Sequence, residues 1–238
     1  MPSRQLTCAL ALVLISSSAG AAGDESSQRN TALELKLGSY KPLIDREPSL
    51  TGTPYQDTFG DSSMLLFEVE GDRLLWQKFG ALGIGVSAGY AEKYGRALIS
   101  PGSGSGLANE STALKVVPLH LLGVYRFDVL AQRMNIPLVP YAKAALVLIP
   151  WWVTKGGKLE TVEGSRGLGA KWGYGFTGGV SLLLDFFEPR LAKDFTSDMG
   201  IVHSYLFAEY VYENVNNFGK RGLDLSSRHW MFGFSMEY

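Results

Sequence analysis

Charged side chains that can do chemistry recur at every second position inside otherwise apolar stretches of the sequence. Glu34 and Lys36 flank Leu35, and a similar alternation brings Glu68 and Glu70 together. Successive side chains of a β-strand point to opposite faces, so each pair lies on one face. Enclosed charges must pair or meet water, which predicts either a polar network or a thin hydrated path. The residues predicted for this interior polar network are Glu34, Lys36, Glu68, Glu70, Arg126, Lys143, Asp185, Glu209 and Glu237.

Histidine chemistry is a weaker possibility. A lipid-modifying hydrolase would need a serine, a histidine and a carboxylate held together. His203 and Ser204 are adjacent in the sequence, so on a strand they point to opposite faces. His120 has no serine at two-residue spacing, and His229 lies at a loop edge. The pattern therefore predicts no catalytic residue and no enzyme, with a hydrolase kept as the second alternative.

The remaining motifs point to no cofactor. The scattered histidines, together with a cysteine only at position 8, show no metal-ligand spacing. The Gly/Ser-rich stretch at Gly102 is not followed by Lys-Ser or Lys-Thr, so it is not a phosphate-binding loop. With 22 basic and 23 acidic residues the net charge is −1, which argues against nucleic-acid binding. We expect no cofactor and no metal.

The first 31 residues are predicted to precede the folded domain. Residues 1–22 resemble a secretory signal peptide, with Arg4, an apolar run from Leu6 to Ile15 and small residues ending at Ala22. Residues 23–31 are polar and are predicted to be a periplasmic lead-in. Beyond them the longest apolar run, 144–153, is half of the roughly 20 residues that a membrane helix needs. Export without a spanning helix leaves a secreted protein, a periplasmic protein or a membrane β-barrel.

The last twelve residues carry the clearest strand pattern. From Trp230 onward one face holds only large apolar side chains, and the other holds mainly small or polar residues such as Gly233 and Ser235. This arrangement suits a strand with lipid on one side and a narrow interior on the other. A chain that stops on an aromatic residue after such a strand resembles the assembly signal of outer-membrane barrels. The predicted assembly-signal strand comprises Trp230, Phe232, Phe234, Met236 and Tyr238.

Alternation along the chain predicts an all-β fold, an eight-stranded antiparallel up-and-down transmembrane β-barrel over residues 32–238. Closure is required because backbone groups in lipid cannot be satisfied by water. Four longer connections are predicted to be surface loops, with both termini in the periplasm. Pro140 and Pro150 suggest bulges or local edges. The predicted strands are Ala32–Lys41, Asp61–Trp76, Leu82–Ala91, Ala113–Phe127, Leu138–Thr154, Trp172–Phe186, Ile201–Glu213 and Ser227–Tyr238.

Five segments support a family resemblance. They are Leu33–Pro42 (LELKLGSYKP), Pro54–Asp61 (PYQDTFGD), Leu122–Leu130 (LGVYRFDVL), Ile136–Lys143 (IPLVPYAK) and Leu182–Pro189 (LLLDFFEP). Together they resemble the myxobacterial-type outer-membrane β-barrel family, over about residues 32–238. The resemblance implies an outer-membrane barrel. It implies no activity, so no catalytic or binding residue is carried over.

The expected function is therefore that of a non-enzymatic protein of the bacterial outer membrane, with a structural or surface-interaction role through four extracellular loops. A narrow passive channel is the first alternative. The expected partners are outer-membrane lipid and lipopolysaccharide, together with the barrel-assembly machinery and an unknown surface ligand. Loop 214–226 is the candidate for contact with a partner or with anionic lipopolysaccharide, since it places Phe218 among Asn216, Asn217, Lys220 and Arg221. The alternative to a membrane barrel is a soluble sandwich or a lipocalin-like barrel, which would have the polar faces of its strands outside.

Overall fold

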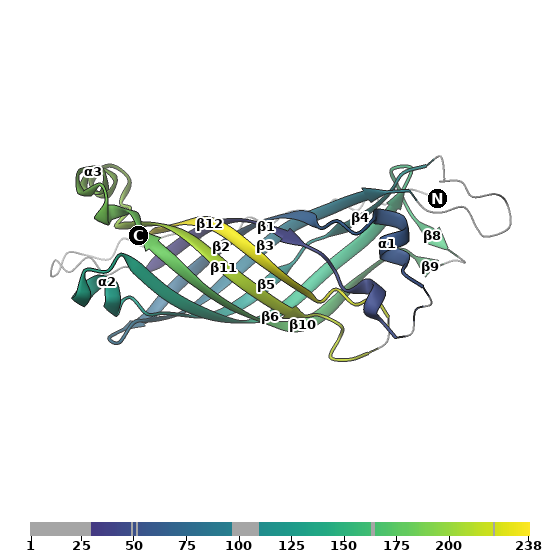
Figure 1. The fold of residues 1–238 in the computed structure, drawn as a ribbon, viewed down its shortest axis with the longest axis horizontal. Coiled ribbons are helices and arrows are strands. Elements are labelled where there is room, and N and C mark those ends of the chain that lie inside the picture. Colours follow the sequence, from purple (N-terminus) through teal and green to yellow (C-terminus); the bar gives the residue numbers. More distant parts are fainter. Residues whose placement is uncertain (1–29, 49, 51, 97–109, 163–164, 221) are drawn as a thin grey trace, which may run out of the picture.

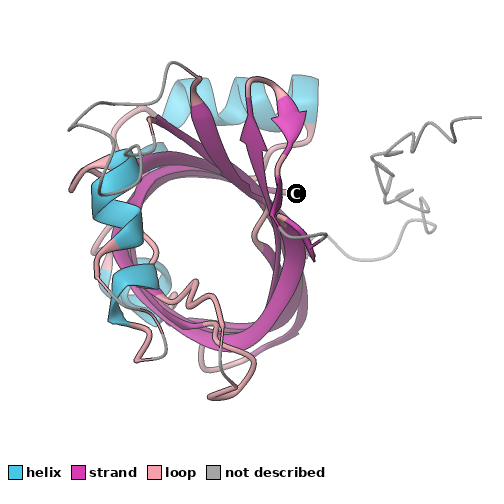
Figure 2. Cartoon of the chain, turned by 90° about the vertical axis from the view of Figure 1, so that its right-hand side faces the viewer, coloured by secondary structure: helices cyan, strands magenta, loops and turns pink. Residues whose placement is uncertain are grey.

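The chain forms a closed ring of antiparallel strands, as the end-on view in Figure 2 shows. The computed structural model describes residues 30–238 except 49, 51, 97–109, 163–164 and 221, so the predicted signal peptide and most of the lead-in lie outside the described residues. The ring closes where the last strand pairs with the first, from Ala32 opposite Glu237 to Gly38 opposite Met231. The predicted eight-stranded barrel is confirmed. In ring order the strands are β1 (Thr31–Tyr40), β2 (Met64–Gln77), β3 (Ala81–Gly95), β4 (Thr112–Val116) followed by β5 (Leu119–Arg126), β6 (Leu138–Lys155), β10 (Leu168–Leu183), β11 (His203–Asn214) and β12 (Ser227–Glu237).

Proline interrupts the ladder at one place without shifting the register. β4 and β5 form one predicted strand, broken at Pro118, which has no N–H to donate. Of the bulges or local edges predicted at Pro140 and Pro150, no bulge occurs, because β6 pairs with β10 in constant register from Leu138 to Trp152. On its other side β6 has a local edge at each proline, where its pairing with β4 and β5 is interrupted or ends. The Pro150 carbonyl accepts from the N–H of Val117 (2.9 Å), at the gap between β4 and β5. That of Pro140 accepts from Phe127 (2.8 Å), just past the end of β5. A residue in an antiparallel ladder directs its N–H and its C=O to the same neighbouring strand. The N–H groups that Pro140 and Pro150 lack would therefore point to places where the ladder has already stopped.

The outer wall of the barrel is apolar. A soluble protein rarely exposes a continuous apolar patch of more than a few hundred Å², whereas the outside of a membrane barrel is an apolar band. Tyr40 at the end of β1 is not part of this wall, because it is fully buried inside the barrel. Exposed outward-facing residues on the wall include Leu37, Leu65, Phe67, Ile84, Leu121, Phe176, Leu206 and Phe232. A surface of this kind suits lipid rather than water.

The two ends of the barrel carry different connections (Figure 1). One end, called here the loop end, holds η1 (Ile44–Arg46), α1 (Pro54–Phe59), β7 (Lys158–Leu159), β8 (Thr161–Val162) and β9 (Ser165–Arg166). The other, called the turn end, holds the C-terminus, α2 (Val129–Met134), η2 (Leu184–Phe186) and α3 (Pro189–Met199). No helix among the described residues has the length and apolar character needed to span a membrane.

Two details at the turn end differ from the sequence prediction. The strand expected to run to Phe186 ends at Leu183, where the chain turns into η2. The connection between this strand and the next, for which no helix was named, contains the eleven-residue helix α3. Proline at the first helical position and Gly200 in a left-handed conformation after the last one explain its limits.

Candidate functional site

Arg126 organises the charges nearest the turn end. Its guanidinium donates to Glu34 Oε1 (2.6 Å), to Glu237 Oε1 (2.7 Å) and to Asp72 Oδ2 (3.1 Å). Tyr205 Oη donates to the other oxygen of Glu237 (3.2 Å). These contacts join β5 to β1, β12 and β2 across the barrel interior. Planar guanidinium groups suit such multiple carboxylate contacts.

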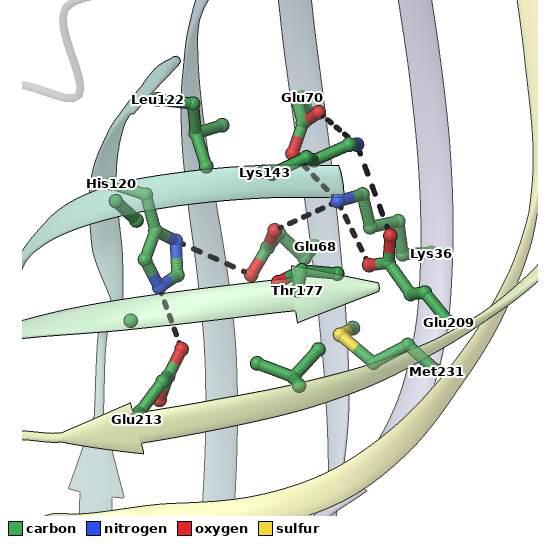
Figure 3. Close-up of a pocket in the computed structure, with 13 residues that line it drawn as sticks. Lys36, Glu68, Glu70, His120, Leu122, Lys143, Thr177, Glu209, Glu213 and Met231 are labelled. Atoms are coloured by element: carbon green, nitrogen blue, oxygen red, sulfur yellow. Dashed lines mark hydrogen bonds and ion pairs between the residues drawn. The ribbon is translucent and has the colours of Figure 1, made fainter. Parts of the chain in front are cut away.

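Two lysines hold the middle of the interior (Figure 3). Lys36 Nζ donates to Glu70 Oε2 (2.6 Å) and Glu209 Oε1 (3.1 Å), and it lies 3.5 Å from Glu68 Oε1. Lys143 Nζ donates to Glu34 Oε2 (2.6 Å) and to Glu70 Oε1. All of these side chains are buried. Buried charges are tolerated when they are paired, and each of these carboxylates lies within 3.5 Å of a lysine Nζ.

His120 continues the chain of contacts toward the loop end. Its Nε2 lies 2.9 Å from Glu213 Oε1, and its Nδ1 lies 2.6 Å from Ser87 Oγ and 3.6 Å from Glu68 Oε2. Together with Arg126, Lys36, Lys143 and their partners, His120 belongs to what we call the interior network. Its members are Glu34, Lys36, Glu68, Glu70, Asp72, His120, Arg126, Tyr141, Lys143, Tyr205, Glu209, Glu213 and Glu237.

Eight of the nine residues predicted from the sequence lie in the interior network, and Asp185 does not. Asp185 sits in η2, where its carboxylate accepts from the backbone N–H of Ser204 (3.1 Å) and lies 2.6 Å from His203 Nδ1. The alternation that placed Asp185 inside the barrel stops at Leu183, so the extrapolation past that residue is wrong.

The prediction also missed network members. Asp72 lies two residues after Glu70, and Glu213 lies four residues after Glu209, so each shares the inward face of its strand, and this signal was available in the sequence. The contact between Ser87 and His120 could not be read from the sequence, because it depends on the register between β3 and β5.

Ser87, His120 and Glu213 have the residue types of a hydrolytic triad, but the site has no room for a substrate. All three side chains are buried inside the barrel. The neighbouring cavity, lined by His120 and Glu213, has about 20 Å³ of free volume, enough for a single water molecule. An acyl chain or a lipid headgroup does not fit there. His203 and Ser204 form no alternative pair, since Asp185 binds the imidazole of one and the backbone of the other.

Carboxylates of Glu34, Glu70 and Asp72 approach within 4.8 Å of one another, a spacing that could hold a metal ion. Lys143 already bridges Glu34 and Glu70, while Arg126 binds Asp72. The charge that a metal ion would neutralise is met by cations of the chain itself.

An apolar layer fills the barrel beyond the network at the loop end. Inward side chains such as Leu66, Val116 and Ile149 meet residues supplied by the loops. Tyr40 Oη donates to the carbonyl of Leu225 (2.7 Å), which fixes loop 214–226 inside the mouth. The loop residues in this layer are Ile44, Tyr55, Val215 and Leu225.

Helix α1 is held in place by a carboxylate. Asp45 accepts from the backbone N–H groups of Tyr55 (2.7 Å) and Gln56 (3.0 Å) in the first turn of α1. Burial, with the Asp45 carboxylate nearby, raises the pKa of Tyr55 to about 12, so the phenol remains neutral at physiological pH. A neutral ring suits the apolar layer that it enters.

Comparison with known proteins identifies the fold and no family. No family model and no curated protein sequence matches the chain. Its structure is similar to outer membrane protein OprG from Pseudomonas aeruginosa, with 12% identity, a TM-score of 0.50, and coverage of 88% of this chain and 96% of that one. Similarity to Ail, the attachment invasion locus protein of Yersinia pestis, has a TM-score of 0.43 at 11% identity, covering 88% and 99%. Similarity to the outer membrane enzyme PagL has a TM-score of 0.41 at 10% identity, covering 87% of this chain and 99% of that one. The chain thus has the eight-stranded fold of outer-membrane β-barrels.

Proposed function

We propose that the protein is an integral, non-enzymatic barrel of the bacterial outer membrane, with a structural or surface-interaction role carried by its loop end. One observation carries the proposal: the interior is filled, by the interior network toward the turn end and by the apolar layer toward the loop end. The second interior cavity, beside Arg126 and Glu237, has about 10 Å³ of free volume, less than the first. An interior packed with side chains is typical of eight-stranded barrels. Any binding to a partner would then take place on the outer surface of the barrel and its loops.

The outer membrane is the proposed location because the wall is apolar and the fold is that of outer-membrane β-barrels. Lipid and lipopolysaccharide are its proposed contacts on the wall, and the barrel-assembly machinery its proposed partner during insertion. The two alternatives have less support. A channel would have to open the apolar layer, and a hydrolase would have to bring its substrate to a cavity of water size.

In loop 214–226, contact with a partner is proposed only for Phe218 and Lys220, which are fewer residues than the sequence suggested. Asn217 Oδ1 accepts from the backbone N–H of Trp172 (2.7 Å), and Asn216 Oδ1 from that of Gly219 (2.8 Å), so both asparagines hold the loop itself. Phe218 stacks on Tyr174 with ring centroids 6.5 Å apart and stays exposed, as does Lys220. An exposed aromatic ring beside a cation suits contact with a partner. Arg221 lies outside the described residues.

Trypsin added to intact cells tests which end faces outward. We expect cleavage after Lys158 and Arg166, which are exposed at the loop end, and none after Arg190 or Lys193, which are exposed on α3. Permeabilising the outer membrane should then allow cleavage in α3. Mass spectrometry of the fragments identifies the cut sites. Cleavage in α3 of intact cells, with the loop end spared, would show that the proposed orientation is inverted.

A further inference from the structure

Helix α3 lies beside the turn end of the barrel and runs across the barrel axis. In Figure 1 the axis is horizontal and α3 is seen nearly end-on, whereas in Figure 2 it is seen from the side, beyond the edge of the ring. A barrel axis close to the membrane normal would place this helix parallel to the membrane plane. That is the orientation of interfacial amphipathic helices.

The helix has one apolar face. Ala192, Phe195 and Met199 recur at three- and four-residue spacing, while Lys193 and Ser197 lie on the opposite side. Met199, at the end of the helix, keeps 64% of its surface exposed. Transfer of an apolar side chain of that size out of water is favourable, so the helix suits a boundary between water and lipid.

The segment leading into α3 adds two exposed aromatic rings. Phe186 and Phe187 are 53% and 61% exposed and contact each other edge to face, with centroids 5.6 Å apart. Asp185, immediately before them, is bound to His203 and Ser204 of β11. The base of the arm that carries α3 is therefore fixed against the barrel wall.

Other apolar residues are exposed on the barrel at the same end. Trp76 on β2, Phe79 in the following turn, Phe127 after β5 and Met134 on α2 are all exposed at the turn end. Aromatic side chains at this height are characteristic of the interface between acyl chains and headgroups. Hence the surface of α3 extends a lipid-facing surface beyond the barrel wall.

We propose that α3 and the preceding Phe186 and Phe187 form a phospholipid-binding arm that lies in the periplasmic leaflet of the outer membrane. Met199 and the two phenylalanines enter the acyl-chain boundary, and the face with Lys193 and Ser197 remains in water. The inference rests on the proposed membrane location. It adds a phospholipid partner at the turn end, away from the surface loops.

Single-site fluorescent labels test this arm in vesicles of phosphatidylethanolamine and phosphatidylglycerol that carry a nitroxide quencher on an acyl chain. In a Cys8→Ser background the introduced cysteine is the only thiol of the chain. Met199→Cys reports the apolar face and Ser197→Cys the polar face, and both positions are exposed in the protein. Leu206→Cys, exposed on the wall of β11, reports insertion of the barrel.

We expect an environment-sensitive dye at 199 and 206 to emit at shorter wavelength and to lose most of its emission to the lipid quencher, with the dye at 197 unaffected. If 206 is quenched but 199 behaves like 197, the barrel is inserted and the arm is not, which overturns this inference alone. If 206 is not quenched, the membrane location fails and the inference fails with it. Heat-dependent gel mobility of each labelled variant confirms that it is folded.

Discussion

Replacing Lys143 by methionine is expected to destabilise the barrel by about 3–5 kcal/mol, because it removes one of the few cations that the buried carboxylates share. Lys143 Nζ contacts Glu34 and Glu70 directly and lies 3.8 Å from Glu209 Oε2. Its side chain is almost completely buried, so water cannot substitute for it. Methionine keeps a flexible side chain of similar length and adds no new charge. Denaturant unfolding of the barrel in detergent measures the change in free energy.

The matched control is Lys158→Met at the loop end, where the lysine is exposed and the expected change is within about 0.5 kcal/mol. Adding Glu70→Gln to Lys143→Met should recover part of the loss, since it removes one negative charge from an interior that has lost one positive charge. A Lys143→Met variant as stable as the control would show that the network does not hold the strands together.

Replacing Phe234, Met236 and Tyr238 together by alanine is expected to abolish barrel assembly. Phe234 lies opposite Leu35 of β1 and Leu206 of β11, so it contributes apolar contacts at the seam where the ring closes. The strands of that seam come from the two ends of the barrel sequence, and joining them carries the largest loop-closure entropy in the fold. Side-chain contacts must offset this cost before the backbone ladder forms. Loss of the folded band in unboiled detergent gels measures the effect.

The control removes a similar row from a strand away from the seam. Leu82, Ile84 and Val86 are exposed on β3, which pairs with β2 across a short turn and with β5 on its other side. Their triple alanine variant is expected to assemble, with reduced stability. If the two triple variants assemble equally well, the closing strand has no special role and the predicted assembly signal is wrong.

Strand alternation was a strong guide to the barrel because one face of each strand meets an apolar exterior and the other a narrow interior. The row from Trp172 to Val180 shows this well, since large residues alternate there with glycine or threonine at almost every position. Alternation cannot show where a strand ends, and Asp185 was placed inside for that reason. It also cannot show which neighbouring strand a backbone group faces, so it left open whether Pro140 and Pro150 make bulges or local edges, and the structure has the local edges.

Side-chain contacts between strands could not be predicted from the sequence, because they depend on strand register and on the length of the side chains. Ser87 and His120 are 33 residues apart and meet only because β3 and β5 pair in that register. The loops held a further difference. Tyr55 and Leu225 come from predicted surface loops, yet both are buried in the mouth of the barrel, where they complete the apolar layer. Shortening those loops should therefore spare these residues.

Planar-bilayer recording of the folded barrel tests the central claim most directly. A filled interior with an apolar layer at the loop end should pass no steady current, so we expect no discrete conductance steps at either polarity. Reproducible single-channel steps whose size changes on substitution of Glu68, Glu70 or Lys143 would contradict the account. They would place an ion path through the interior network and make the channel the better description of the protein.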